Sequence, residues 1–186
     1  MKVVQPIRDF DTVSDIIDYL MERSQRDCLL FMTGVYTGLR ISDILTLRVK
    51  DVRDKEYITI KEQKTKKNKL ILVQYDLKVM IEEFIEDKKD NEYLFRSRQG
   101  RNKPITRQRA YKILREVAEE FHLKSIGTHT LRKTFGYHMY QRDKDVAMLQ
   151  EIFNHHHQHD TLRYIGVSQD AIDKARNRLS FRKKRS

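Results

Sequence analysis

Apolar residues recur at helical spacing along almost the whole chain, and only two short β-rich runs interrupt them. The first stripe consists of Val13, Ile16, Ile17, Leu20 and Met21, and similar stripes follow in residues 76–85 and 106–121. Residues 57–60 and 70–73 are rich in β-forming side chains and flank a lysine-rich turn, which predicts a hairpin. The pattern predicts a mainly α (α+β) fold, a helical domain with one small antiparallel sheet.

The segment from residue 27 to residue 43 predicts a central helix followed by a tight turn. Residues 29–32 are apolar on every side, as in a helix at the middle of a core. Gly38 is a natural left-handed end for this helix, and Arg40 stands just beyond the turn. Ser42 is expected to cap the next short helix.

Basic residues are gathered in particular stretches of the chain. The net charge is +11, five lysines lie within residues 61–69, and seven basic residues without an acid lie within residues 174–186. Acids concentrate in residues 82–90 instead. A generally basic, solvated surface is the simpler interpretation, but this segregation favours one basic face and therefore a polyanionic partner, nucleic acid first.

Length and composition favour a single domain in the cytoplasm. The 186 residues suffice for a single domain over residues 1–186, in which residues 168–186 form a C-terminal helix and a basic tail. Ala171, Ile172, Ala175 and Leu179 are expected on the inner face of that helix. The chain has a single cysteine, no apolar run long enough to span a membrane and no apolar signal-peptide core, which together indicate a reducing, non-membrane setting.

Four histidines, His155, His156, His157 and His159, cluster shortly before Tyr164. A zinc site is one interpretation, but adjacent side chains point apart and no second cysteine or His-Glu-x-x-His pattern is present. We therefore expect no metal, with His156, His157 and His159 in an exposed polar turn. The other interpretation makes Tyr164 a nucleophile that follows His155 by nine positions.

Two arginines provide a site for phosphate. Arg132 follows His129 by three positions at a helix start, so that both side chains can face one ligand. The planar guanidinium fork matches phosphate oxygens, and Arg40 and Arg132 on rigid helices would clamp a phosphodiester and its charged transition state. A lysine on the hairpin could protonate a leaving oxygen.

These elements, in this order and spacing, resemble the tyrosine recombinase (phage integrase) family. The resemblance rests on Thr37-Gly38-Leu39-Arg40-Ile41-Ser42-Asp43, Lys64 in Gln-Lys-Thr-Lys, His129-Thr130-Leu131-Arg132, and the pair His155 and Tyr164. It covers nearly the whole chain. The implied activity is site-specific DNA recombination or integration, in which DNA is cleaved and rejoined through a covalent 3′-phosphotyrosyl link.

The resemblance also implies a role for each residue. Tyr164 would be the nucleophile, while Arg40 and Arg132 would hold the nonbridging phosphate oxygens. Lys64 would be the general acid, and Asp43 would support Arg40. His129 and His155 would assist by hydrogen bonding and proton transfer. No metal or nucleotide cofactor would be required, since the bond energy is conserved in the phosphotyrosyl link.

Some positions depart from the family pattern or leave alternatives open. Asn154 stands where the family usually has glycine, and asparagine accepts the same left-handed turn. Lys66 could replace Lys64 as the acid, and both share the hairpin with Lys67 and Lys69. Residues expected to contact the DNA backbone are Lys66, Lys67, Lys69, Arg107 and Arg109.

The motifs begin within forty residues, so the N-terminal core-binding domain of typical members is not expected. The chain is expected to be a fragment or a naturally short member.

The implied partners are double-stranded DNA, three further copies of the chain in a tetramer on DNA, and accessory DNA-bending proteins. Two rival functions remain. One is a topoisomerase of type IB that uses the same chemistry on one duplex, and the other is a catalytically silent DNA-binding regulator of recombination.

Overall fold

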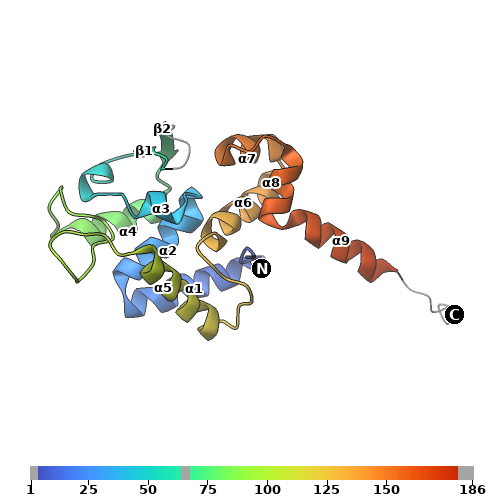
Figure 1. Ribbon diagram of the computed structural model, residues 1–186, viewed down its shortest axis with the longest axis horizontal. Coiled ribbons are helices and arrows are strands. Elements are labelled where there is room, and N and C mark those ends of the chain that lie inside the picture. Colours follow the sequence, from blue (N-terminus) through green and yellow to red (C-terminus); the bar gives the residue numbers. More distant parts are fainter. Residues whose placement is uncertain (1–3, 64–67, 180–186) are drawn as a thin grey trace.

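The computed structural model describes residues 4–63 and 68–179, which form a helical body with one hairpin at its edge (Figure 1). The helices are α1 (Phe10–Arg23), α2 (Gln25–Thr37), α3 (Ile41–Ile44), η1 (Val49–Asp51), α4 (Tyr75–Ile85), α5 (Arg107–Glu120), α6 (Thr130–Asp143), α7 (Val146–Phe153), α8 (Gln158–Ile165) and α9 (Val167–Arg178). The strands are β1 (Tyr57–Lys61) and β2 (Asn68–Leu72). The predicted mainly α fold with a small antiparallel sheet is confirmed.

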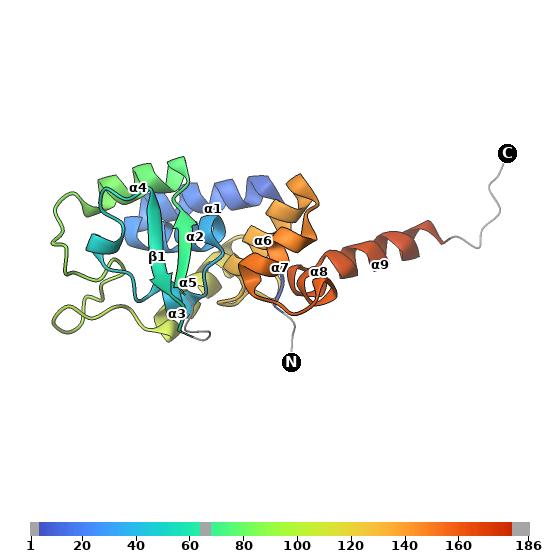
Figure 2. The same ribbon diagram turned by 90° about the horizontal axis from the view of Figure 1, so that it is seen from above.

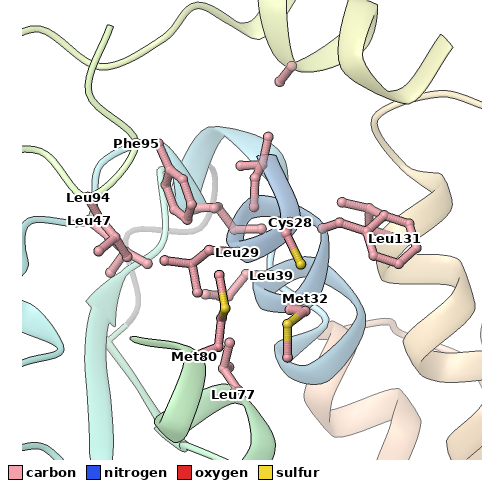
Figure 3. Packing of buried hydrophobic residues seen from close by; sticks show 14 of the residues in the cluster. Cys28, Leu29, Met32, Leu39, Leu47, Leu77, Met80, Leu94, Phe95 and Leu131 are labelled. Carbon is pink, nitrogen blue, oxygen red and sulfur yellow. The ribbon is translucent and has the colours of Figure 1, made fainter. Parts of the chain in front are cut away.

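Helix α2 lies at the centre of the larger core, as its all-round apolar sequence predicts. It packs against α1, α4 and α6, and residues 28–32 are buried (Figure 3). Gly38 ends α2 in the left-handed conformation, with φ of 62°. The chain then turns directly into α3, so that Arg40 is held at the edge of a rigid core.

The hairpin pairs β1 with β2 in antiparallel register, with Tyr57 opposite Leu72 and Lys61 opposite Asn68. Alternation buries Ile58 and Ile60 in β1, and in β2 it turns Lys69 toward the protein while Leu70 remains exposed. Lys64 and Lys66, the two candidates for the general acid, lie outside the described residues, as does Lys67.

A second, smaller apolar cluster carries the C-terminal part of the fold. Leu149 and Phe153 from α7 and Ile165 from α8 are buried, with Phe135 and Tyr164 packed around them. Gly136 in α6 lets this cluster approach closely, because a Cβ there would lie 2.6 Å from Phe153 Cζ and 2.8 Å from Ile165 Cγ2. The smaller cluster therefore depends on a residue without a side chain.

Gly136→Ala is expected to destabilise the protein by about 1–3 kcal/mol because the added methyl overpacks the contact of α6 with α7 and α8. Alanine is the better helix former by about 1 kcal/mol, which offsets part of that loss. Urea unfolding monitored by circular dichroism measures the change. Gln141→Ala, at an exposed position of the same helix, is the control, and equal stability of the two variants would contradict the close packing.

Two local predictions are wrong. Ser42 lies inside α3, and Arg40 takes the N-cap position, because the chain enters the helix directly after the Gly38 turn. Helix α9 does not bury its apolar stripe: it extends away from the other helices (Figures 1 and 2), with Ile172 46% and Leu179 67% exposed. Ala171 is exposed as well, and the side chain of Ala175 is not among those described.

Within the described part of the chain, no helix has the length and apolar character needed to cross a bilayer.

Candidate active site

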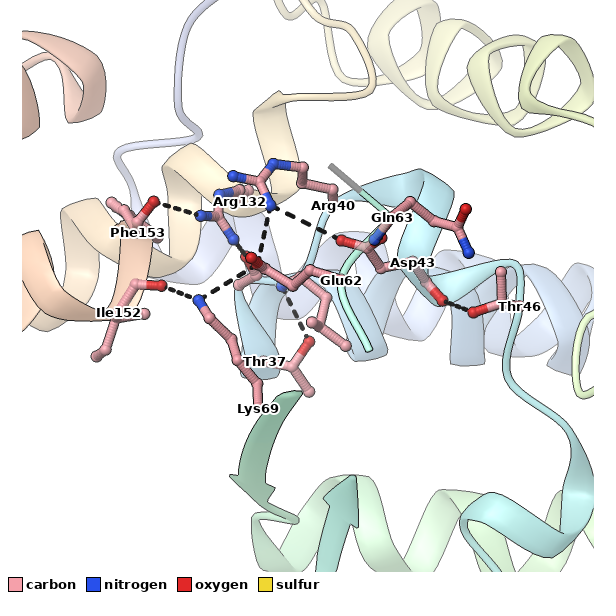
Figure 4. A network of polar contacts seen from close by, with 12 residues as sticks. Thr37, Arg40, Asp43, Thr46, Glu62, Gln63, Lys69, Arg132, Ile152 and Phe153 are labelled. Atoms are coloured by element: carbon pink, nitrogen blue, oxygen red, sulfur yellow. Dashed lines mark hydrogen bonds and ion pairs between the residues drawn. The ribbon is translucent and has the colours of Figure 1, made fainter. Parts of the chain in front are cut away.

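Arg40 lies beside two buried carboxylates. Its Nη1 is 2.8 Å from Glu62 Oε1 and 3.9 Å from Asp43 Oδ2 (Figure 4). Both acids are fully buried, whereas the arginine side chain is 18% exposed. Asp43 also accepts a hydrogen bond from the Gln63 backbone N–H at 2.8 Å, which ties the hairpin to α3. Glu62 and Asp43 thus orient Arg40 from the protein side, while part of the arginine side chain remains open to solvent.

Arg132, in the first turn of α6, lies at the junction of the two apolar clusters and is only 3% exposed. Its Nη1 donates to the Gly38 carbonyl at 2.5 Å and its Nη2 to the Phe153 carbonyl at 3.3 Å. The guanidinium also lies over the Phe153 ring, 4.5 Å from the centroid. Arg132 therefore joins the ends of α2 and α7 as well as contributing a buried positive charge.

His129 and Tyr164 meet, although 35 residues separate them. His129 Nδ1 is 3.3 Å from the Tyr164 hydroxyl. Desolvation, followed by the cations of Arg132, Lys133, Arg40 and Arg107, lowers the pKa of His129 below its ordinary value. The ring is therefore neutral at pH 7, and in the tautomer with Nδ1 unprotonated it can accept the tyrosine proton.

Tyr164 is enclosed by the histidine turn predicted from sequence. Asn154 adopts the left-handed conformation, with φ of 54°, and brings the His155 ring to 5.3 Å from the Tyr164 ring. His155 Nδ1 in turn lies 3.0 Å from Thr161 Oγ1. Desolvation raises the pKa of Tyr164, and the positive charges of Arg132 and Arg40 oppose that shift. The hydroxyl is therefore protonated at pH 7, and a proton acceptor is needed for it to act as a nucleophile.

Two residues of this arrangement were not singled out from sequence. Glu62 is the carboxylate partner of Arg40, and its signal was that it is the one acid among the lysines of residues 61–69. Lys133 follows Arg132 directly and places its ammonium 5.0 Å from the Tyr164 ring centroid. It also donates to the Val4 carbonyl at 2.7 Å, so the tyrosine ring packs against a cation anchored to the N-terminal segment.

The described residues leave the site with a positive charge. Arg40, Arg132 and Lys69 are positive, whereas Glu62 and Asp43 are the carboxylates that the same network contains. These five groups leave one positive charge, and Lys133 and Arg107 add further positive charge near Tyr164 and His129. The site thus has the electrostatic character needed to accept one DNA phosphate.

The residues expected to bind the DNA backbone are placed differently from one another. Lys69 turns inward, where its ammonium lies 3.3 Å from Glu62. Arg109, on α5, is 3.7 Å from Asp27 and 3.4 Å from Glu116. Arg107, at the start of α5, is exposed and close enough to His129 to influence its pKa. Of Lys69, Arg107 and Arg109, Arg107 is therefore the best placed to meet a phosphate near Tyr164.

The four histidines do not converge. His155 is partly buried against Tyr164, whereas His156, His157 and His159 are exposed. Among the residues that the structure describes, no group of three or more histidine, cysteine or acidic side chains is arranged to hold a metal ion.

Two arginines and a histidine beside a tyrosine, on a helical fold with one hairpin, are the features of one class of protein, and this chain is a tyrosine recombinase catalytic domain. The chain belongs to the phage integrase family, whose model matches residues 8–170. The predicted family resemblance is confirmed.

A similar known protein agrees with this family, and two solved structures agree with the fold. The chain is 52% identical over 170 residues to the probable integrase/recombinase YoeC of Bacillus subtilis (strain 168), covering 91% of this chain and 93% of YoeC. It resembles the crystal structure of XerA recombinase with a TM-score of 0.75 at 19% identity, over 95% of this chain and 67% of that one. For a lambda integrase tetramer bound to a Holliday junction, the TM-score is 0.65 at 16% identity, over 88% and 49%. The two crystallised chains are thus considerably longer than the matched region.

Proposed function

We propose that this chain cleaves and rejoins duplex DNA through a covalent 3′-phosphotyrosyl intermediate. The Tyr164 oxygen attacks a DNA phosphate as its proton passes to a neighbouring acceptor. The new phosphorus–oxygen bond forms while the bond to the 5′ oxygen breaks, and that oxygen takes up a proton and leaves as a 5′-hydroxyl. Attack by a 5′-hydroxyl on the phosphotyrosine reverses these steps and rejoins the strand.

One observation carries this proposal: the Tyr164 hydroxyl lies 3.3 Å from His129 Nδ1 while Arg132 and Arg40 act on it electrostatically. In our proposal His129 accepts the tyrosine proton, and the two arginines bind the nonbridging oxygens as negative charge develops on them. His155 contributes hydrogen bonding beside the tyrosine. Asp43, with its carboxylate 3.9 Å from Arg40, supports that arginine.

The acid for the 5′ oxygen rests on the resemblance alone. We assign it to Lys64, with Lys66 as the alternative on the same turn, and both lie outside the described residues. An ammonium is suited to this step because it can deliver a proton to an alkoxide as that leaves.

Double-stranded DNA is the proposed substrate and a homotetramer on DNA the proposed active assembly. The lambda integrase structure is described as a tetramer bound to a Holliday junction, which supports the same assembly here. Helix α9 supports it as well, because Ile172 and Leu179 are exposed and can dock on a neighbouring copy. Accessory DNA-bending proteins would act on this assembly, and a DNA substrate is the reason to expect the cytoplasm.

The proposal is tested by incubating the protein with nicked suicide duplexes that carry the candidate target site, in EDTA. A covalent protein–DNA adduct is expected, because the proposed chemistry uses no metal. If no adduct forms on cognate DNA although the DNA binds, the protein is a silent regulator. Relaxation of supercoils without exchange between partner sites would indicate a topoisomerase instead.

The cleavage rate should depend on the protonation of His129. The pKa of His129 lies below its ordinary value of 6.5, so the ring becomes half protonated by solvent only at a pH below 6.5. A ring already protonated by solvent cannot accept the tyrosine proton. We therefore expect single-turnover cleavage to stay at its plateau down to pH 6.5 and to fall as the pH is lowered further. In His129→Gln the plateau should drop about 10²–10⁴-fold and the fall attributable to His129 should disappear. A half-maximal rate above pH 6.5 in the unmodified protein would contradict this assignment.

A further inference from the structure

Lys69 has an internal position that its sequence context does not suggest. Its side chain is 21% exposed, and its ammonium donates to the Ile152 carbonyl at the end of α7 (Figure 4). The same ammonium lies 3.3 Å from Glu62 Oε1. Lys69 thus connects β2 to the C-terminal part of the fold, rather than presenting its charge to solvent.

Glu62 shares one oxygen between this lysine and the phosphate-binding arginine. Its Oε1 is 2.8 Å from Arg40 Nη1 and 3.3 Å from Lys69 Nζ. The carboxylate is fully buried, and a buried charge that loses one of its partners is costly to the fold. The positions of Arg40 and Lys69 are therefore coupled through Glu62.

The Ile152 carbonyl that accepts from Lys69 lies in the last turn of α7, shortly before His155. The carbonyls of Ile152 and Phe153 belong to the last turn of α7, which intrahelical hydrogen bonds leave unsatisfied. Lys69 and Arg132 donate to these two carbonyls, and cations are favourable at a helix C-terminus. The chain then makes the Asn154 turn and delivers His155 to the Tyr164 ring. Holding the end of α7 therefore holds the histidine beside the nucleophile.

We propose that Lys69 and Glu62 form a positioning pair, in which Glu62 orients Arg40 and Lys69 fixes the end of α7, so that the phosphate clamp and the histidine–tyrosine pair keep one relative placement. This inference rests on the proposed cleavage reaction. It assigns Lys69 neither a DNA contact nor a proton transfer, the two roles that its place on the hairpin would otherwise suggest.

The first test compares Lys69→Met with Arg107→Met in DNA binding and single-turnover cleavage. A positioning residue affects the rate alone: we expect Lys69→Met to cleave about 100-fold more slowly with an unchanged dissociation constant and salt dependence. Arg107→Met should weaken binding and reduce the slope of log affinity against log salt by about 0.9, the value for one phosphate contact. An unchanged rate in Lys69→Met, or a loss of salt slope like that of Arg107→Met, overturns the proposal.

A second test separates positioning from proton transfer. In a substrate whose 5′ oxygen at the cleavage site is replaced by sulfur, the leaving thiolate needs no proton from the protein. Lys69→Met should remain slow on this substrate, and Lys69→Arg, which keeps charge and donors, should recover part of the rate on ordinary DNA. Full recovery of Lys69→Met on the sulfur substrate would make Lys69 the general acid and overturn the proposal.

Glu62→Gln provides an independent variant should Lys69→Met fold poorly. Because both changes disrupt one network, the rate loss of the double variant should be much smaller than the product of the two single losses, and simple multiplication would refute the coupling. The His155 ring signals in ¹⁵N-histidine NMR spectra should shift in Lys69→Met and not in Lys78→Met, a half-buried lysine on α4 whose side chain is 41% exposed. This readout requires no cleavage. Unshifted signals overturn the positioning role, whereas a shifted His155 without any adduct in the unmodified protein removes only the proposed reaction.

Discussion

Tyr164→Phe is expected to abolish the covalent adduct, with a rate loss of at least about 10⁴-fold, the scale found when a nucleophile is removed from a catalytic group that acts as a unit. The only atom lost is the hydroxyl that would attack the phosphate. The phenylalanine ring retains the packing against Phe153 and His155, whose centroids lie 5.4 and 5.3 Å from that of Tyr164. DNA affinity should be unchanged and stability should change by about 1 kcal/mol or less, since one partly exposed hydrogen bond is lost.

Tyr140→Phe is the matched control, because Tyr140 packs against the same smaller apolar cluster and loses the same atom. It should form adduct at the rate of the unmodified protein. Denaturing gels with end-labelled suicide duplex measure both variants. An adduct that persists in Tyr164→Phe, or one lost equally in Tyr140→Phe, would remove Tyr164 from the role of nucleophile.

Much of the fold follows from local patterns. The stripes of α1, α4 and α5 and the hairpin could be predicted because helical and alternating periodicities are each visible in the sequence. Gly38 and Asn154 could be predicted as left-handed ends, and these two turns aim Arg40 and His155. The proximity of His129, Arg132 and Tyr164 followed from the family resemblance, since no local pattern relates residues so far apart.

The direction of Lys69 could not be predicted. Residues 70–73 are all apolar, so alternation gives no indication of which face of β2 is buried, and either direction is open to a lysine there. In the structure Leu70 and Leu72 are exposed while Lys69 faces Glu62. The exposure of α9 could not be predicted for a different reason: an apolar stripe shows that a helix surface needs covering but not whether the same chain covers it.

Arg132→Lys should lose both activity and stability. Lysine preserves the charge but offers one ammonium in place of the planar fork, and this cannot reproduce the diverging bonds to the Gly38 and Phe153 carbonyls. We expect the cleavage rate to fall about 10³-fold through the weaker hold on the transition-state oxygens. Unfolding free energy should fall by about 1–3 kcal/mol because a buried carbonyl loses its donor. Single-turnover cleavage and urea unfolding measure the two effects.

Arg40→Lys and Arg163→Lys distinguish these two contributions. Arg40 leaves part of its side chain open to solvent and bonds a carboxylate that lysine can also pair, so its replacement should slow cleavage with a smaller loss of stability. Arg163, on α8, has a side chain 71% exposed and an ion pair with Asp160, and its replacement should change neither property. Equal stability losses in Arg132→Lys and Arg40→Lys would mean that Arg132 does not join the two clusters. The slower cleavage of Arg132→Lys would then come from the loss of its phosphate contact alone.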